Sequence, residues 1–243
     1  MPNNYFKFKQ FTVYQELASM KVCTDACVFG AYLSQNVLDN AHQILDIGTG
    51  TGLLSLMIAQ NCKQYTAIDA VELEQNAYQQ AKINFEQSPF DVQISAFHQA
   101  IQLFESATKY DLIVSNPPFF NNYEKAKNTQ QNFAKHTDAL SFEALASNIA
   151  RLLSENGKAW IMLPEYEMQL FSSKMLENSL QPFFSILLHN YAQKKVLRHI
   201  RGFEYNISPQ NITEKIETLN IYDTPNVYAN DFIQLLKPFY LHL

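Results

Sequence analysis

The segment from Asp111 to Phe120 reads DLIVSNPPFF and combines residue types that could do chemistry. Its apolar half predicts a buried strand, which must end at the two prolines because proline has no N–H to donate to a neighbouring strand. Open α/β sheets bind their ligands at the edge where such strands end. The side-chain amide of Asn116, the carbonyl of Pro117 and the flat ring of Phe119 would together suit a flat substrate that carries an amino group.

The segment LDIGTGTG, residues 45–52, holds three of the six glycines in the chain. A strand, a tight glycine turn and the start of a helix bring the backbone close to a ligand, and the first N–H groups of the helix are unpaired. The spacing is GxGxG, whereas dinucleotide sites read GxGxxG. Asp46 stands two residues before Gly48, and a carboxylate there would repel a pyrophosphate and attract a cation. A sulfonium ligand with an α-amino group therefore fits this turn better than a dinucleotide.

Both motifs resemble those of class I S-adenosylmethionine-dependent methyltransferases. The resemblance implies that Asp46, Gly48 and Gly50 bind this cofactor. Further along the chain, Glu72 matches the family position whose carboxylate accepts hydrogen bonds from both ribose hydroxyls. Asp69, three residues earlier in the same predicted strand, is the rival for this role.

The part of the motif that meets the cofactor's adenine departs from the family pattern. Where the family usually has an acidic residue that accepts from the adenine amine, this chain reads FHQAI, residues 97–101. We expect the amide oxygen of Gln99 to act as the acceptor instead.

The segment NPPFF resembles the [DNS]PP[YFW] motif of amino-methyltransferases, and the chemistry explains the residue types. The exocyclic amine of adenine is a poor nucleophile because its lone pair is delocalised into the ring. If the Asn116 side-chain oxygen and the Pro117 carbonyl each accept one N–H, the lone pair points at the sulfonium methyl, and such positioning contributes several kcal/mol. Phe119 would stack on the base, worth roughly 1–3 kcal/mol, with Phe120 as a second substrate contact. A base inside a helix must first be flipped out, whereas a loop base is already partly exposed.

Several further segments narrow the resemblance. Met20 to Ala31 reads MKVCTDACVFGA, KHTD starts at Lys135, and DFI and FYL follow near the end of the chain. Together they resemble the bacterial tRNA1(Val) adenine-N6 methyltransferases over nearly the whole chain. The resemblance implies methylation of the adenine beside the anticodon. It also implies that Thr24 and Asp25 close over the methionine end of the cofactor, although a helix cap is an equally good interpretation of these two residues.

Binding of an anticodon stem-loop would need a basic path beside the site. The chain carries a net charge of −5, which counts against a nucleic-acid partner, but a local patch can act while the whole is acidic. Contacts with phosphates should make binding salt-dependent. The candidate phosphate contacts are Lys125, Lys127, Lys135, Arg198 and Arg201.

Length and composition set the frame. A chain of 243 residues that is 47% hydrophobic can bury a sizeable core. We expect one methyltransferase domain over 1–243, with 1–40 capping the cofactor and substrate and 41–243 forming the core. No apolar run is long enough for a membrane span, and no secretion signal is evident. Three cysteines with no metal-binding spacing suit free thiols in a reducing cytoplasm and predict no metal.

Alternating apolar segments and turns predict an α/β, Rossmann-like fold with a mostly parallel twisted sheet, helices on both faces and antiparallel strands at one edge. The predicted strands are 43–47, 65–71, 91–95, 111–115, 158–163 (after a turn at Gly157), 183–189, 196–206 and 214–222. The predicted helices are 53–60, 73–85, 101–106, 141–153 and 228–236, with Ser141 capping the fourth. The polar segment 121–132 is expected to be a loop over the site.

Three other functions compete with this interpretation. A protein glutamine-N5 methyltransferase resembles this chain in its NPP motif, but such enzymes place a helical substrate domain before the glycine loop, and only 44 residues precede Leu45. A DNA adenine methyltransferase is less favoured because no target-recognition domain is evident. A methyltransferase fold that holds cofactor or RNA without catalysis is the remaining alternative, against which the NPP motif and the glycine loop both speak.

Overall fold

The computed structural model describes residues 4–18, 20–38, 41–118, 140–206 and 213–243. A nine-stranded sheet runs in the order β11-β10-β8-β9-β7-β6-β3-β4-β5, and a separate pair, β1-β2, lies near the N-terminus. The strands are β1 (Tyr5–Lys7), β2 (Thr12–Tyr14), β3 (Gln43–Ile47), β4 (Ala67–Glu72), β5 (Ile94–His98), β6 (Tyr110–Ser115), β7 (Leu153–Leu163), β8 (Leu180–Tyr191), β9 (Val196–Tyr205), β10 (Lys215–Thr224) and β11 (Val227–Tyr228).

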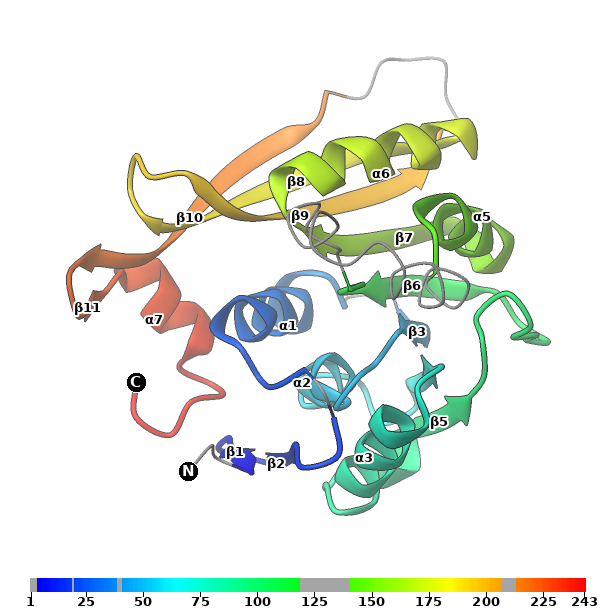
Figure 1. Cartoon of the computed structure of the whole chain (residues 1–243), viewed down its shortest axis with the longest axis horizontal. Coiled ribbons are helices and arrows are strands. Elements are labelled where there is room, and N and C mark those ends of the chain that lie inside the picture. The colour runs from blue at the N-terminus through cyan, green and yellow to red at the C-terminus, as the bar shows by residue number, and fades with distance from the viewer. Residues whose placement is uncertain (1–3, 19, 39–40, 119–139, 207–212) are drawn as a thin grey trace, which may run out of the picture.

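Helices cover both faces of the sheet, and Figure 1 shows α1 with α7 on one side and α5 with α6 on the other. The described helices are α1 (Thr24–Asn36), α2 (Leu53–Ala59), α3 (Gln75–Glu86), α5 (Phe142–Leu152), α6 (Glu165–Glu177) and α7 (Asn230–Leu236), with a 3₁₀ turn at Asp91–Gln93. Ser141 caps α5 by accepting a hydrogen bond from the Ala144 N–H at 3.1 Å. The predicted α/β class and the cap at Ser141 are therefore confirmed.

Alternation along the central strands divides the core into two layers. Ile44 and Leu112 belong to the cluster that packs against α1 and α2. Their neighbours Leu45 and Ile113 belong to the cluster that packs against α5 and α6. Successive side chains of a strand point to opposite faces, so a parallel strand buried on both faces must be apolar throughout. β3 pairs parallel with both β4 and β6. The carboxyl ends of these three strands therefore lie at the same edge of the sheet, which carries the glycine loop and the NPP motif.

The C-terminal strands differ in one respect from the expected antiparallel arrangement. β9 pairs antiparallel with both β7 and β8, but β10 pairs parallel with β8. β9 already has β7 and β8 as neighbours, so β10 joins the sheet at the free edge of β8. β10 runs in the direction opposite to β9, and it is therefore parallel to β8.

Two predicted elements were misplaced. The strand predicted at 91–95 begins at Ile94 and extends to His98, because its partner β4 ends at Glu72, which pairs with His98. The helix predicted at 101–106 is only a turn, closed by the Phe104 N–H to the Ile101 carbonyl at 3.2 Å. Arg151 of α5 donates to the carbonyls of both Ile101 and Phe104, at 3.1 and 2.8 Å, and so fastens this turn to α5.

The predicted turn at Gly157 is also wrong, because Gly157 lies inside β7. The pairing of β6 with β7 jumps between Tyr110 and Leu112, from Leu153 to Lys158. The intervening residues form an irregularity in the strand. A Cβ on Gly157 would stand 2.8 Å from the Tyr110 carbonyl oxygen, so only glycine allows this approach.

Within the described ranges, no helix has both the length and the apolar composition needed to cross a membrane. Cys23, Cys27 and Cys62 are all free thiols.

Candidate active site

The glycine loop between β3 and α2 is built by backbone hydrogen bonds and left-handed residues. Gly48 and Thr49 donate to the Val71 carbonyl of β4 at 2.8 and 3.2 Å. Gly48, Gly50 and Gly52 have φ values of 72°, 60° and 82°, which L-residues with a Cβ rarely adopt. The tight turn predicted from the glycine spacing is therefore present.

The three glycines serve different purposes. A Cβ on Gly48 or Gly50 would meet no atom within 4 Å, so the backbone there faces open space. A Cβ on Gly52 would stand 2.3 Å from the Phe85 ring. The absence of a side chain at Gly52 therefore lets Phe85 of α3 pack against the loop. Gly48 and Gly50 thus leave room for a ligand, and Gly52 positions the loop.

Asp46 lies fully buried below this loop. Its Oδ2 accepts hydrogen bonds from Thr49 Oγ1 at 2.6 Å and from Ser55 Oγ at 2.7 Å. Its Oδ1 is buried with no hydrogen-bond partner. Burial raises the pKa of this carboxyl to about 6, against the lowering effect of the hydrogen bonds from Thr49 and Ser55. An orphaned carboxylate oxygen in this position suits a cationic ligand.

Glu72 and Asp69 are separated by the geometry of β4. Glu72 accepts from the Gly50 N–H at 2.9 Å, and from the N–H groups of Leu73 and Glu74 at 2.8 and 2.9 Å. Asp69 instead accepts from Tyr110 Oη at 2.6 Å. Residues three apart in a strand point to opposite faces, so Glu72 adjoins the glycine loop and Asp69 does not.

Gln99 lies at the end of β5 next to Glu72, whose carbonyl accepts from the Gln99 N–H at 3.0 Å. The Gln99 side-chain Nε2 donates to the Leu103 carbonyl at 2.8 Å. This bond orients the amide by holding its nitrogen in the following turn. The predicted adenine acceptor is therefore beside the predicted ribose acceptor.

Asn116 follows the last residue of β6 and reaches the same space as the glycine loop. β3 and β6 are neighbours, with Asp46 opposite Val114. Ser115 Oγ fastens the two strand ends by donating to the Ile47 carbonyl at 2.8 Å. Asn116 consequently lines one pocket together with the glycine loop and the segment before α1; the lining residues are Met20, Lys21, Val22, Cys23, Ala26, Gly48, Thr49, Gly50, Thr51, Leu53, Leu54 and Asn116.

The segment before α1 forms the other wall of this pocket, which encloses about 50 Å³. That volume holds roughly one or two waters, so a larger ligand must extend outside the pocket or displace this wall. Thr24 is the first residue of α1, and the N-cap is Cys23, which makes no side-chain capping bond. The interpretation of Thr24 as a helix cap is therefore wrong.

Asp25 is buried and ion-paired with Arg198 of β9, whose Nε lies 2.7 Å from Asp25 Oδ2. Arg201 lies on the opposite face of β9 and binds both carboxylate oxygens of Glu214, at 2.7 and 2.5 Å, and Ser172 of α6 at 2.9 Å. The two arginines thus occupy different faces of β9, and each has a carboxylate partner. Their phosphate contacts stay predictions from the sequence.

The remaining predicted substrate contacts lie outside the described residues. They are Phe119, Phe120, Lys125, Lys127 and Lys135, together with the loop predicted at 121–132.

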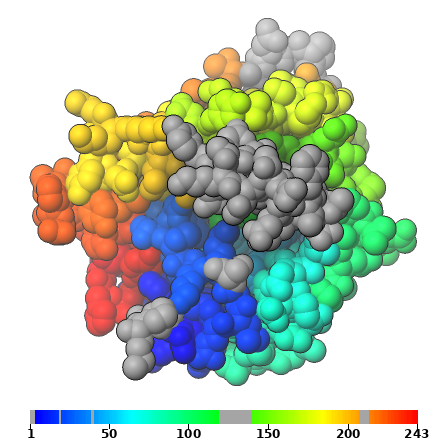
Figure 2. All heavy atoms as spheres, in the orientation of Figure 1, coloured from blue at the N-terminus to red at the C-terminus, as the bar shows by residue number. Residues whose placement is uncertain are grey.

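Asn84 is a positioning residue that sequence reasoning missed. It is fully buried in α3 and exchanges hydrogen bonds with the Tyr14 backbone, 2.9 Å to its N–H and 2.8 Å to its carbonyl. Its Nδ2 also donates to the Thr51 carbonyl at 2.8 Å. One side chain thus joins the N-terminal strand to the glycine loop, and Figure 2 shows the blue N-terminal part of the chain against the cyan region of α3. The available signal was an asparagine, a poor helix former, inside a strongly helical segment.

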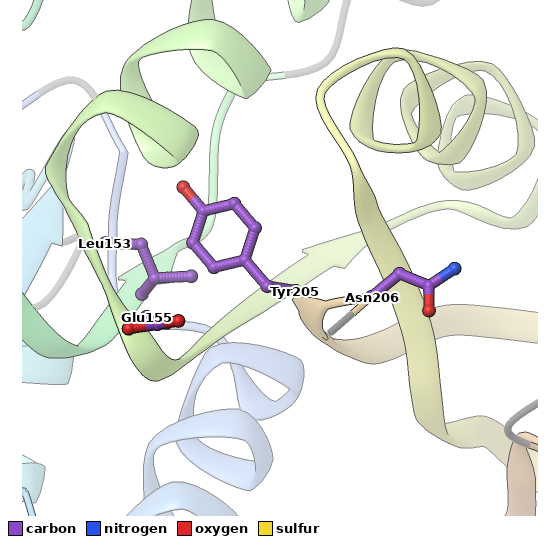
Figure 3. Close-up of a pocket in the computed structure, with 4 residues that line it drawn as sticks. All are labelled: Leu153, Glu155, Tyr205 and Asn206. Atoms are coloured by element: carbon purple, nitrogen blue, oxygen red, sulfur yellow. The ribbon is translucent and has the colours of Figure 1, made fainter. Parts of the chain in front are cut away.

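A second hollow, shown in Figure 3, lies between the start of β7 and the end of β9 and is lined by Leu153, Glu155, Tyr205 and Asn206. Tyr205 Oη donates to the Ala150 carbonyl of α5. This hollow shares no lining residue with the glycine-loop pocket, so we do not assign it to the candidate site.

Known proteins are similar in sequence to this chain over nearly its whole length. Residues 22–181 match the family model described as Methyltransferase small domain. The tRNA1(Val) (adenine(37)-N6)-methyltransferase of Dyadobacter fermentans is 43% identical over 243 residues, covering 99% of each chain. This chain belongs to the tRNA1(Val) (adenine(37)-N6)-methyltransferase family. Another member, from Pseudoalteromonas translucida, is 40% identical over 98% of this chain and 99% of its own.

Solved structures agree on the fold of this family member. A predicted O-methyltransferase from Agrobacterium tumefaciens superposes with a TM-score of 0.63 at 14% identity, over 87% of this chain and 95% of its own. A putative class I S-adenosylmethionine-dependent methyltransferase from Listeria monocytogenes gives a TM-score of 0.59 at 14% identity, over 85% of this chain and 67% of its own. At such identities the likeness establishes a class I methyltransferase fold and nothing finer.

Proposed function

We propose that this protein transfers a methyl group from S-adenosylmethionine to the N6 amine of adenine 37 in tRNA1(Val). The observation that carries the proposal is that Asn116 and the glycine loop line one pocket, in a chain whose relatives have that activity in their names. The side-chain amide of Asn116, at the end of β6, thus lies beside a glycine loop whose backbone is open to a ligand.

The residues around the loop fit S-adenosylmethionine. Gly48 and Gly50 leave space against the backbone, and the orphaned Oδ1 of Asp46 would accept from the α-ammonium group. Glu72, now held by the Gly50 N–H, is the carboxylate nearest the loop for the ribose hydroxyls. Gln99 would meet the adenine, and Thr24 with Asp25 would cover the methionine end. When bound, the cofactor supplies an electrophilic methyl group on a sulfonium.

The role of the NPP corner is to hold the target amine. Asn116 Oδ1 and the Pro117 carbonyl would each accept one N–H, which localises the lone pair on nitrogen. A strand end locked by two prolines keeps both acceptors in place, because proline fixes φ. Such positioning accounts for several kcal/mol without a strong general base. The amine sheds its extra proton after the methyl group has been transferred.

The finer features of the substrate are part of the proposal. The target adenine lies in the anticodon stem-loop, where it is not paired in a helix and costs little to expose. Phe119 would stack on the base with Phe120 as a second substrate contact, and Lys125, Lys127 and Lys135 would contact phosphates. An enzyme with this substrate works in the cytoplasm, and the described residues contain no cluster of His, Cys, Asp and Glu suited to a metal ion.

Nucleoside mass spectrometry tests the proposal. The purified protein is incubated with S-adenosylmethionine and unmodified tRNA1(Val), and the tRNA is digested to nucleosides. We expect N6-methyladenosine at one equivalent per tRNA, and none from a transcript with guanine at position 37. Methyl transfer to release factor or to DNA, with none to tRNA, would replace this function by one of the alternatives. Cofactor binding without transfer to any of the three would indicate a non-catalytic module.

A further inference from the structure

A third cavity, distinct from the glycine-loop pocket and from the hollow beside Tyr205, lies at the opposite end of the sheet from the glycine loop. It has a volume of about 520 Å³ and is bordered by the C-terminal half of α1 and the starts of β6 and β7. Tyr32, Asp111, Lys158, Trp160, Phe183 and Phe184 are among its lining residues. None of these residues lines the glycine-loop pocket.

The wall of this cavity is a cluster of four aromatic rings. Trp160 stands 5.6 Å from Tyr32, 5.5 Å from Phe183 and 5.7 Å from Phe184, measured between ring centroids. Phe183 and Phe184 are consecutive, so a regular strand would direct them to opposite faces. The register of β8 against β9 shifts between Pro182 and Phe184. This bulge brings both phenylalanines to the side of Trp160, and bulges commonly re-aim side chains at sites.

Trp160 contributes an unsatisfied donor. It is 3% exposed, and its Nε1 is buried without a hydrogen-bond partner. Buried polar groups almost always have a partner, and one without a partner costs free energy. Trp160 lines the cavity, so an acceptor bound there is the natural partner of this N–H once binding displaces the atoms that shield Nε1.

The charges around the cavity favour a neutral or anionic ligand. Lys158 Nζ lies 4.8 Å from the centre of the Phe183 ring. An aromatic cage of this kind would otherwise suit a cation, but an ammonium group already occupies the ring face. Asp111 accepts through its Oδ2 from the His42 and Gln43 N–H groups, at 2.9 and 3.1 Å. The cavity therefore offers flat apolar walls, one N–H without a partner and the cation Lys158, and the Nζ of Lys215 lies 5.2 Å from the centre of the Phe184 ring.

From this combination we infer that the cavity binds a nucleobase, with the base packed against the aromatic wall and a ring acceptor on Trp160 Nε1. Every base has a flat face for stacking and at least one acceptor on its edge. Lys158 is placed to meet the phosphate of the same nucleotide. The base can come from a free nucleotide or from single-stranded RNA; the RNA source rests on the proposed function.

The cavity and the candidate active site are linked by α1. Ala26, in its first turn, borders the glycine-loop pocket, and Tyr32 borders the cavity. At 1.5 Å per residue these two positions are about 9 Å apart along the helix. RNA in the active site could therefore place a neighbouring nucleotide near the cavity without crossing the sheet.

Trp160 is the only tryptophan in the chain, so its indole resonance reports this cavity directly. The full-length protein, labelled with ¹⁵N, is titrated with adenosine monophosphate, uridine monophosphate and a short oligouridylate. We expect the one indole N–H cross-peak to shift and saturate, with tryptophan fluorescence quenched in parallel. An unmoved peak at millimolar concentrations of all three probes overturns the inference. Saturation by the mononucleotides identifies a nucleotide site, and saturation by the oligomer alone identifies an RNA contact.

Variants separate this cavity from the cofactor site. Phe183→Leu and Lys158→Met should weaken nucleotide binding about fivefold or more, whereas Lys194→Met, at the exposed β8–β9 turn, should not. Glu72→Ala should leave the indole shift unchanged; loss of the shift in that variant would mean that the nucleotide binds the glycine loop instead. Unchanged affinity in both Phe183→Leu and Lys158→Met also overturns the inference. Nucleotide binding without tRNA methylation would leave the cavity assigned and remove only the proposed function.

Discussion

Nε of Arg198 lies 2.7 Å from Oδ2 of Asp25, which joins β9 to the first turn of α1. The two side chains are 21% and 10% exposed, so the ion pair is largely shielded from water. It anchors the helix whose first turn borders the glycine-loop pocket. Arg198, which the sequence suggested as an RNA contact, thus also braces one wall of the glycine-loop pocket.

Removing this ion pair should loosen the wall. We expect Arg198→Met to raise the dissociation constant for S-adenosylmethionine about tenfold, because a shielded Asp25 without its partner is costly and α1 shifts to solvate it. Isothermal titration calorimetry measures the change. The double variant Arg198→Met, Asp25→Asn should recover part of the loss, since no lone charge remains. If tRNA affinity fell and cofactor affinity did not, Arg198 would be an RNA contact after all.

Asn116 should matter for the chemical step and little for cofactor binding. Asn116→Ala removes one of the two proposed acceptors and is expected to lower the single-turnover rate about 100-fold, the usual effect of misplacing a reacting group. Asn116→Asp keeps an acceptor oxygen and should retain more activity than the alanine variant. A rate equal to that of the unmodified protein in Asn116→Ala would remove Asn116 from the mechanism.

Glu72 and Asp69 make a matched pair of carboxylates on one strand. Glu72→Gln should weaken S-adenosylmethionine binding about tenfold or more, because hydrogen bonds to a charged acceptor are worth roughly 1.5–3 kcal/mol. Asp69→Asn should leave the cofactor affinity unchanged, since Asp69 accepts from Tyr110 on the other face. Calorimetric titration of both variants decides between them, and the reverse pattern would assign the ribose to Asp69.

Cofactor affinity should depend on pH through Asp46. Its pKa is raised to about 6 by burial, with nearby Glu72 adding to the rise. A raised carboxyl pKa stabilises the ligand-free fold at low pH, and this stability is lost as the pH rises through about 6. Binding of a cation needs the ionised form, so affinity should be about tenfold weaker at pH 5 than at pH 7, with proton release on binding.

The control for this pH dependence is Asp46→Asn. It should bind S-adenosylmethionine weakly at both pH values and lose the proton release, measured by calorimetry in two buffers of different ionisation enthalpy. Persistence of the same pH profile in this variant would mean that Asp46 is not the group responsible for it.

The glycines of the loop should separate stability from binding. Gly52→Ala is expected to lower the free energy of unfolding by about 2–5 kcal/mol, from left-handed strain and the collision with Phe85. Gly50→Ala introduces the left-handed strain without a collision, so it should lower the free energy of unfolding by only about 1–2 kcal/mol. Its main effect should be weaker binding of the cofactor. Urea unfolding and calorimetry on the same two variants provide the comparison. Equal losses of stability in both would mean that the open space at Gly50 has no special use.

The local motifs could be predicted from the sequence because each depends on a few neighbouring residues. Glycines at Gly48, Gly50 and Gly52 permit positive φ, prolines end β6, and the alternating pattern of apolar segments and turns indicates a βαβ sheet. The predicted helix at 101–106 was wrong because its apolar spacing suits a single turn as well as a helix. The protein has the turn, and Arg151, some fifty residues away, fastens it by donating to the carbonyls of Ile101 and Phe104.

The sequence by itself determined the class of fold, the family and the residues of the motifs, since these follow from local conformation and from a pattern shared with relatives. Only the tertiary structure decided which carboxylate meets the glycine loop, which carboxylate pairs with each of the two arginines, and that Phe183 and Phe184 share one face. Those outcomes depend on strand pairing, on a bulge and on contacts between segments distant in the chain. The sequence shows which residues are charged, and only the folded structure shows which residue each of them pairs with.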